Sequence, residues 1–247
     1  MSGEAAGGEE CAWSFIMNEP NSMFKRAWIT AGHSELWNCQ KTYCEIPWGD
    51  LPKIEGVTDD LKWLDQVPSE LRDAVEETST LNSSDNDIGN LEDIVAQAQK
   101  LNLKLPESFL RFMRDADLQE KVPTCTACYL GLSEEIIPVV GSVDHFLLRF
   151  MNDSQNCVMW YLHFRRGEHV GVVASNYFIE PEIFELMEYE AIKREDVFRD
   201  ALLCADTFTE FLYRFWIESS IWYSLHEGFQ PSPLQEDYLK QITRKLK

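Results

Sequence analysis

The sequence predicts an α+β fold, in which a mostly antiparallel sheet of about five or six strands carries helices on it and follows a tryptophan-rich N-terminal extension. Three observations lead to this prediction. Helical patterns surround a Leu-Pro-Glu step within residues 91–115, short β-rich runs follow within 129–176, and a long aromatic helix is indicated within 206–228. Because short turns separate the β-rich runs, we expect the strands to form an antiparallel meander.

The first 77 residues differ in composition from the rest of the chain. Residues 1–10 are mostly Gly, Ala and Glu, and we expect them to be disordered. Residues 11–77 form the tryptophan-rich extension, where short strands or ordered loops are expected. The pattern leaves open whether this extension is a separate subdomain or packs onto the rest. Its tryptophans are Trp13, Trp28, Trp37, Trp48 and Trp63, out of 8 in the whole chain.

A polar stretch separates the extension from the first helical pattern. Residues 78–90, TSTLNSSDNDIGN, are rich in Asn, Asp and Ser and are predicted to be a linker. Asn90 can then cap an amphipathic helix whose apolar positions recur at three-and-four spacing. Pro106 is suited to begin a second helix, because its missing N–H costs nothing in the first turn. The side chains expected to fasten this second helix to the sheet are Phe109, Phe112 and Met113.

The strands and the last long helix have clear boundaries in the sequence. The best hairpin joins CVMWYLHF to HVGVVAS through the turn RRGE, and Pro138 is expected at an edge or a break of the sheet. Asp206, Thr207 and Glu210 resemble a helix start, and Gly228 a helix end. The helix between them is apolar over much of its circumference, so we expect it to be buried against one face of the sheet. Residues 230–247 are expected to be a peripheral helix or a mobile end.

The charge of the chain restricts its partners. There are 22 basic and 42 acidic residues, which gives a formal net charge of −20. Such a chain repels nucleic acids and anionic lipid, so we expect neither as a partner, whereas basic proteins are attracted to it. The alternative is that the acidity serves solubility. No apolar run reaches the roughly 18 residues that cross a bilayer, and no secretory signal is visible, so a cytoplasmic location is expected.

The sequence contains no motif that is specific for catalysis or for a cofactor. The seven scattered cysteines are expected to be reduced thiols. Cys125 and Cys128 form one Cys-x-x-Cys pair, which supplies two ligands where a structural zinc site usually needs four. The five histidines lack the spacing of helical metal motifs. We therefore predict no catalytic residue, no cofactor and no metal site. A metal-dependent enzyme with a dispersed site remains the alternative.

Aromatic residues are more abundant than a small sheet needs on one face. Most are expected in the core, but some could line an open face as anchors for a partner, surrounded by acidic residues. The candidate partner-binding residues are Trp160, Tyr161, Tyr177, Phe178, Glu134 and Glu135.

The order of these parts resembles a known family. The LxLPESFxxF step at 103–112, the meander with its Trp-Tyr-Leu run, and the closing helix FxxFLYRFWIE are similar to the SUKH superfamily of SMI/KNR-type domains. The resemblance covers roughly residues 88–227. One departure is Asp115-Ala-Asp, which stands where the family usually has an Asn-Gly turn.

The resemblance implies a binding domain without catalytic residues, which we place at residues 91–229. In bacteria many such domains are immunity proteins that neutralise a toxin, often a nuclease, and in eukaryotes they are regulatory or scaffold proteins. We therefore expect a non-catalytic intracellular module that binds another protein, and the charge favours a basic partner. The sequence leaves the partner and the oligomeric state open.

Overall fold

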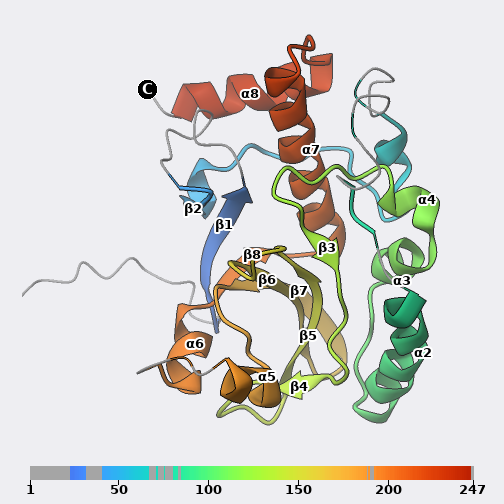
Figure 1. Cartoon of the computed structure of the whole chain (residues 1–247), viewed down its shortest axis with the longest axis vertical. Helices are drawn as coiled ribbons and strands as arrows, with labels where there is room; N and C mark the ends of the chain where they lie inside the picture. Colours follow the sequence, from blue (N-terminus) through green and yellow to red (C-terminus); the bar gives the residue numbers. More distant parts are fainter. Residues whose placement is uncertain are drawn as a thin grey trace, which may run out of the picture.

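The computed structural model describes residues 23–31, 41–66, 71, 75, 80–82, 85–187, 189 and 192–245. The N-terminal segment predicted to be disordered, residues 1–10, lies outside the described residues, as do Trp13 and Trp37. Within the described part, the chain forms one large sheet with helices on both faces (Figure 1). The α+β class and the mostly antiparallel sheet are thus confirmed.

The sheet is larger than the sequence predicted. Its strand order is β2-β1-β8-β7-β6-β5-β3, and β4 pairs with β5 outside this path. Eight strands replace the expected five or six, because two N-terminal strands and one short late strand join the meander. The strands are β1 (Lys25–Ala31), β2 (Tyr43–Pro47), β3 (Tyr129–Leu130), β4 (Ile137–Pro138), β5 (His145–Asn152), β6 (Met159–Arg165), β7 (Glu168–Ser175) and β8 (Leu202–Ala205).

The tryptophan-rich extension contributes two of these strands. β1 pairs with β2 in antiparallel register and with β8 in parallel register, where Lys25 lies opposite Leu202 and Arg26 opposite Leu203. The question that the sequence left open is therefore answered for β1 and β2, which extend the same sheet as the meander. A parallel pair between residues so far apart leaves no signature in local periodicity.

The meander follows the prediction closely. β5, β6 and β7 pair in antiparallel order, and the turn between β6 and β7 is Arg166-Gly167. Gly167 has a φ of 87°, a conformation that glycine adopts without strain. Pro138 lies in β4, which among the described strands pairs with β5 alone, in agreement with its expected edge position.

Most helices were also predicted, with one boundary shifted. α2 begins at Asp85, so residues 85–90 of the predicted 78–90 linker are helical rather than irregular. The C-terminal segment forms a helix, α8. The α-helices are α2 (Asp85–Lys100), α3 (Glu107–Arg114), α4 (Ala116–Gln119), α5 (Pro181–Leu186), α6 (Arg194–Asp200), α7 (Phe208–His226) and α8 (Pro233–Lys245).

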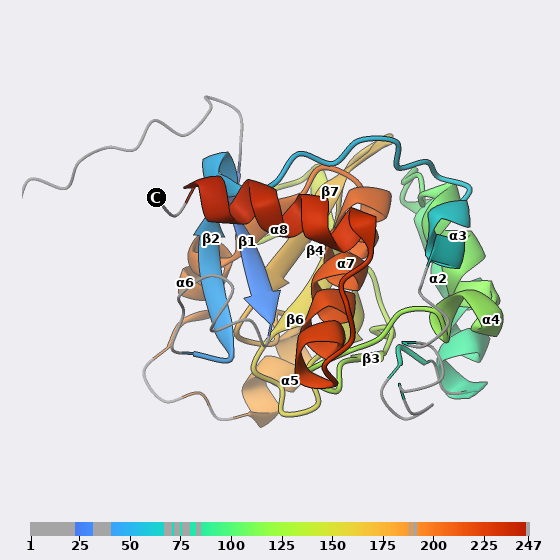
Figure 2. The same cartoon turned by 90° about the horizontal axis from the view of Figure 1, so that it is seen from above.

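Helix α7 covers one face of the sheet, as expected from its aromatic sequence (Figure 2). Phe211 packs against Trp28 of β1 and Trp160 of β6, and Phe208 packs against Phe109 and Phe112 of α3. Phe109 and Phe112 thus fasten α3 to α7 and, through the ring of Phe150 in β5, to the sheet. This is the main hydrophobic core.

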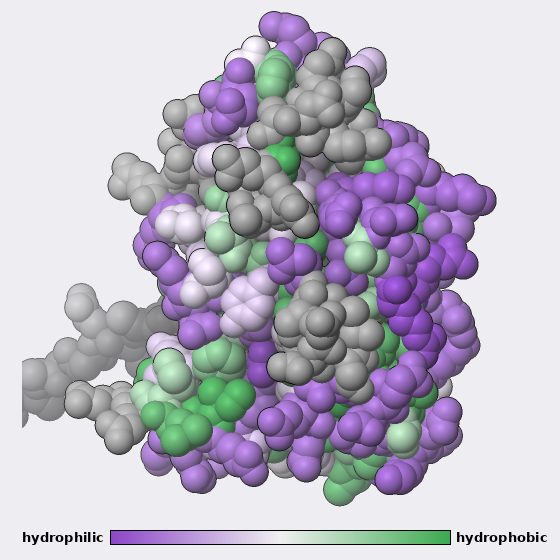
Figure 3. Space-filling model, turned by 45° about the vertical axis from the view of Figure 1, so that its right-hand side comes forward, coloured by the Kyte–Doolittle hydropathy of each residue, from purple (hydrophilic) through white to green (hydrophobic). Residues whose placement is uncertain are grey.

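A second, smaller core lies on the opposite face. Val197 and Phe198 of α6 pack there together with Phe178 and Tyr161, and α5 adds the half-buried Ile183 and Phe184. The two short helices cover less of the sheet than α7 does. The surface seen in Figure 3 is largely hydrophilic, in keeping with the net charge of −20.

Candidate functional site

The structure places most of the predicted partner-binding aromatics inside the protein. Trp160 and Tyr161 are 1% and 0% exposed, and Phe178 is 7% exposed. Their side chains belong to the two cores, so we withdraw these three as surface anchors. The reason is that β6 lies between β5 and β7 inside the sheet with a packed layer on each face, rather than under an open face.

The other three candidates remain accessible to different degrees. Tyr177 is half-buried, and its ring packs against Tyr189. Glu134 and Glu135 are exposed in the segment before β4. The structure therefore does not gather the six predicted residues into one surface.

The cysteines differ from one another in state. Cys125, Cys128, Cys157 and Cys204 are thiols, whereas Cys44 is disulfide-bonded, which corrects the expectation of reduced thiols throughout. Burial raises the pKa of Cys125 to about 12 and that of Cys128 to about 11, so neither is a thiolate at neutral pH. Among the described residues, no three His, Cys, Asp or Glu side chains are grouped as metal ligands would be.

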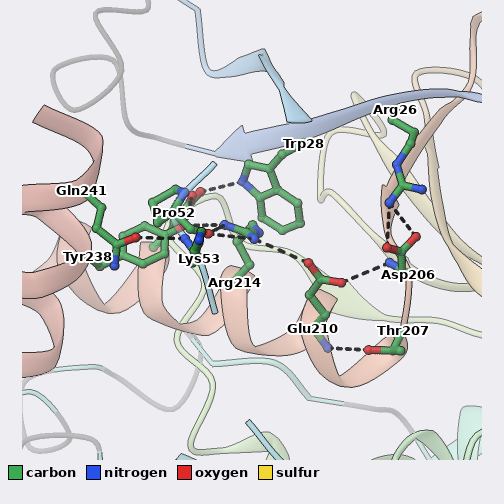
Figure 4. Close-up of polar contacts among 11 residues, drawn as sticks. Arg26, Trp28, Pro52, Lys53, Asp206, Thr207, Glu210, Arg214, Tyr238 and Gln241 are labelled. Atoms are coloured by element: carbon green, nitrogen blue, oxygen red, sulfur yellow. Dashed lines mark hydrogen bonds and ion pairs between the residues drawn. The ribbon is translucent and has the colours of Figure 1, made fainter. Parts of the chain in front are cut away.

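A groove that the sequence did not predict lies between residues 48–59 and the first turns of α7 (Figure 4). Its volume is about 940 Å³, which is in the range of ligand-binding clefts. One wall is an irregular segment with exposed Lys53, Glu55 and Asp59, and the other wall is helical. The helical wall consists of Thr207, Thr209, Glu210 and Arg214.

The helical wall begins with a well-formed cap, as the sequence indicated. The Thr207 hydroxyl accepts a hydrogen bond from the Glu210 N–H at 3.0 Å, and the Glu210 carboxylate accepts one from the Asp206 N–H at 3.2 Å. Arg26 of β1 donates to both carboxylate oxygens of Asp206, at 2.7 and 2.6 Å, and its guanidinium lies over the Trp48 ring. The start of α7 is thereby tied to β1 and to the opposite wall.

Arg214 connects the two walls at the base of the groove. Its side chain is 3% exposed, and both terminal nitrogens donate to the Pro52 carbonyl at 3.3 Å. One of them also donates to the Tyr238 hydroxyl at 3.1 Å. The carboxylate of Glu210 lies 3.6 Å away and offsets part of the buried charge. The Nε of Arg214 has no hydrogen-bond partner among the described residues.

A buried carboxylate, that of Glu218, lies beneath the floor of the groove. Glu218, one turn further along α7, accepts hydrogen bonds from the Trp28 indole N–H, the Thr30 hydroxyl and the Tyr238 hydroxyl, each at 2.8 Å. Burial raises the pKa of Glu218, and the three donors act in the opposite direction because they stabilise its charged form. Four elements, β1, α7, α8 and the segment 48–59, are therefore locked together by Arg214 and Glu218.

Two more contacts hold the irregular wall. The Lys53 N–H donates to the Gln241 side chain of α8 at 2.9 Å, and the Thr209 hydroxyl donates to the Asp59 carboxylate. The groove is thus open but has fixed sides. Such a site can receive an extended chain without the entropic cost of ordering its own walls.

The sequence contained only part of the signal for this groove. Trp48 and the capping residues of α7 were visible as local patterns, but the two walls are about 150 residues apart in the chain, as the contact between Asp59 and Thr209 illustrates. A buried Arg and Glu one turn apart within an otherwise aromatic helix are the one local hint.

Comparisons with known proteins found no match. No family model matches the chain, and neither a curated protein nor a solved structure matches it significantly. Among the described residues, no helix has the length and apolar character that a transmembrane span requires.

Proposed function

We propose that this chain is a non-catalytic protein-binding module, and that its groove receives an extended, basic segment of the partner. The observation that carries the proposal is the groove itself, in which the carboxylates of Glu55, Asp59 and Glu210 outnumber the cationic Lys53 and Arg214 on a chain of net charge −20. Carboxylates placed along a cleft favour Lys and Arg side chains and speed the encounter with a basic partner.

The fixed walls support recognition of a peptide segment. Arg214, Lys53 and Asp59 already make their structural contacts within the protein, so binding does not have to order the segment 48–59. Thr207 and Thr209 add hydroxyl oxygens next to the carboxylates. An extended segment with alternating positive and small polar side chains would match this lining best.

We propose the SUKH type as the module's family. The order of α2, the Leu-Pro-Glu start of α3, the β5–β6–β7 meander and α7 supports this assignment. The partner classes that follow are a basic toxin, such as a nuclease neutralised by an immunity protein, and a basic protein within a regulatory or scaffold assembly. Both classes would present the positive charge that the groove requires.

The test uses a defined peptide. A short peptide of alternating Lys and Thr should bind the full chain in isothermal titration calorimetry, and its affinity should fall as salt is raised. In Glu55→Lys, where a groove carboxylate is reversed, we expect the Kd to rise about tenfold. The same peptide with Glu in place of Lys should not bind.

The matched control is Glu135→Lys, which makes the same charge change at an exposed position that does not line the groove. Its Kd for the Lys-Thr peptide should stay within about twofold of the unmodified protein. Equal losses in Glu55→Lys and Glu135→Lys would show that binding depends on overall charge, and the assignment of the groove would then be wrong.

A further inference from the structure

The end of helix α5 exposes apolar side chains on the face of the sheet opposite to α7. Leu186 is 80% exposed and Met187 is 43% exposed. Ile183 and Phe184 are half-buried and pack on the second core. Ile183, Leu186 and Met187 follow the three-and-four spacing of one helix face, so they form a continuous apolar ridge. Figure 3 shows an apolar patch at its lower left, at the height at which Figure 1 places α5.

This ridge is held in place from both ends. Glu180, just before α5, is 7% exposed, pairs with the Arg149 side chain at 2.5 Å and accepts a hydrogen bond from the Tyr161 hydroxyl at 2.9 Å. After α5, the Tyr189 ring packs against Phe184. The apolar side chains are thus presented by an anchored helix, and a partner would find them preorganised.

Acidic side chains flank the ridge. Glu182 and Glu185 of α5 are exposed, and Glu195 is exposed at the start of α6. The cationic side chain of Arg194 is turned inward, since it donates to the Ile179 carbonyl at 2.8 Å. Apolar anchors with a charged margin are the usual composition of a protein-binding surface.

We propose that this α5 surface, formed by Ile183, Phe184, Leu186, Met187, Glu182 and Glu185, docks an amphipathic helix of a partner protein that carries Lys or Arg beside its apolar face. The ridge would pack along the apolar face of that helix, and the two glutamates would meet its basic flank. Met187 adds an unbranched side chain that adapts to the partner's shape.

Charge argues for a partner protein rather than a second copy of this chain. Each copy has a formal net charge of −20, and pairing two α5 surfaces would place the glutamates of one next to those of the other. A basic helix removes this repulsion. The α5 surface also differs from the groove in its layer of the fold and in its chemistry, so it constitutes a second docking site.

The experiment uses the full chain and a designed probe. The probe is an 18-residue Leu/Lys peptide with Leu on one helical face and Lys on the other, and its control is a permuted peptide of identical composition without such a face. We expect the amphipathic peptide to bind more tightly than the permuted one. In Leu186→Ser the Kd for the amphipathic peptide should rise at least about tenfold, because a large exposed anchor is removed.

The control variant is Leu225→Ser, which truncates another exposed leucine, 47% exposed, near the C-terminal end of α7 on the other side of the sheet. Its Kd should stay within about twofold, as should that of the groove variant Glu55→Lys. Circular dichroism would verify that every variant is folded. Because the probes and the variants are separate, failure here leaves the groove assignment untouched, and the reverse also holds.

Three results would overturn the proposal. The first is equal binding of the amphipathic and permuted peptides. The second is an equal loss in Leu186→Ser and Leu225→Ser. The third is a concentration-dependent dimer in analytical ultracentrifugation that Leu186→Ser abolishes, which would identify a second copy as the occupant.

Discussion

The two faces of the sheet solve the same packing problem in different ways. Along β6, side chains alternate, so that Trp160 and Leu162 join the core under α7 while Tyr161 and Met159 join the core under α5 and α6. The α7 face is covered by one helix of 19 residues together with α2, α3 and α8. The opposite face is covered by helices of 6 and 7 residues and leaves apolar side chains exposed.

Both faces bury polar groups, and on the α7 face too a buried atom, the Nε of Arg214, has no hydrogen-bond partner among the described residues. On the α7 face, Glu218 receives three hydrogen bonds from two elements, β1 and α8. On the opposite face, Glu180 is paired, but His163 is 2% exposed and its Nδ1 has no partner among the described residues. The comparison teaches that the α7 face carries the larger buried polar network and the groove, whereas the opposite face leaves apolar side chains exposed for a second partner.

The largest loss of stability is expected in the buried network of the α7 face. Glu218→Ala would leave the donors of Trp28, Thr30 and Tyr238 without their acceptor inside the core. We expect it to lower the free energy of unfolding by about 3 to 5 kcal/mol, since each unpaired buried donor is costly. Urea denaturation followed by tryptophan fluorescence measures this change.

The counterpart on the opposite face is Tyr161→Phe. It removes one hydroxyl, which donates to Glu180 and accepts from the Ile179 N–H, while Glu180 keeps its ion pair with Arg149. We expect a loss of about 1 to 2 kcal/mol. A loss in Tyr161→Phe as large as that in Glu218→Ala would contradict the proposed difference between the faces.

Acidic pH is expected to lower the free energy of unfolding by an intermediate amount, through the buried histidines of the face opposite to α7. His145 Nδ1 and His163 Nε2 are 2.8 Å apart, and burial lowers the pKa of His163 to about 3, with the nearby His145 and His169 acting in the same direction. The unfolded chain takes up this proton near pH 6.5, so it binds more protons than the folded state between about pH 6.5 and 3. Stability is complete above this window and is lost as pH falls through it, by about 2 kcal/mol at pH 5 from His163 alone.

The variant His163→Leu sharpens this point. It removes the titrating ring, so the slope of unfolding free energy against pH should become smaller between pH 6.5 and 5. A residual slope is expected from His169, because burial lowers its pKa to about 4. Urea denaturation at several pH values measures the slope, and an unchanged slope in His163→Leu would show that this ring is not the source.

Local patterns in the sequence predicted much of this fold. The hairpin around Gly167 and the start of α7 at Thr207 were visible because turns and caps depend on residues close together in the chain. α3 was visible for the same reason, since Pro106 and the spacing of Phe109 and Phe112 lie within one helix. These elements required no knowledge of distant contacts.

Long-range pairing accounts for what the sequence did not predict. The parallel contact of β1 with β8 joins residues near 25 to residues near 202, and it converts the tryptophan-rich extension into part of the sheet. With β6 inside that sheet and packed on both faces, Trp160 and Tyr161 are buried instead of exposed. The groove has the same origin, because its walls come from residues 48–59 and 207–214, which are far apart in the chain.

The smallest loss of stability is expected at the start of α7, because the helices on the two faces begin differently. α7 has a side-chain cap at Thr207, whereas α5 follows Glu180 with Pro181 in its first turn and has no side-chain cap bond within the described residues. Thr207→Ala would leave the Glu210 N–H without its acceptor and should lower the free energy of unfolding by about 1 kcal/mol. Thr207→Ser keeps the hydroxyl and should cost only a few tenths, so an equal loss in the two variants, measured by urea denaturation, would show that the hydrogen bond is not what stabilises this helix start.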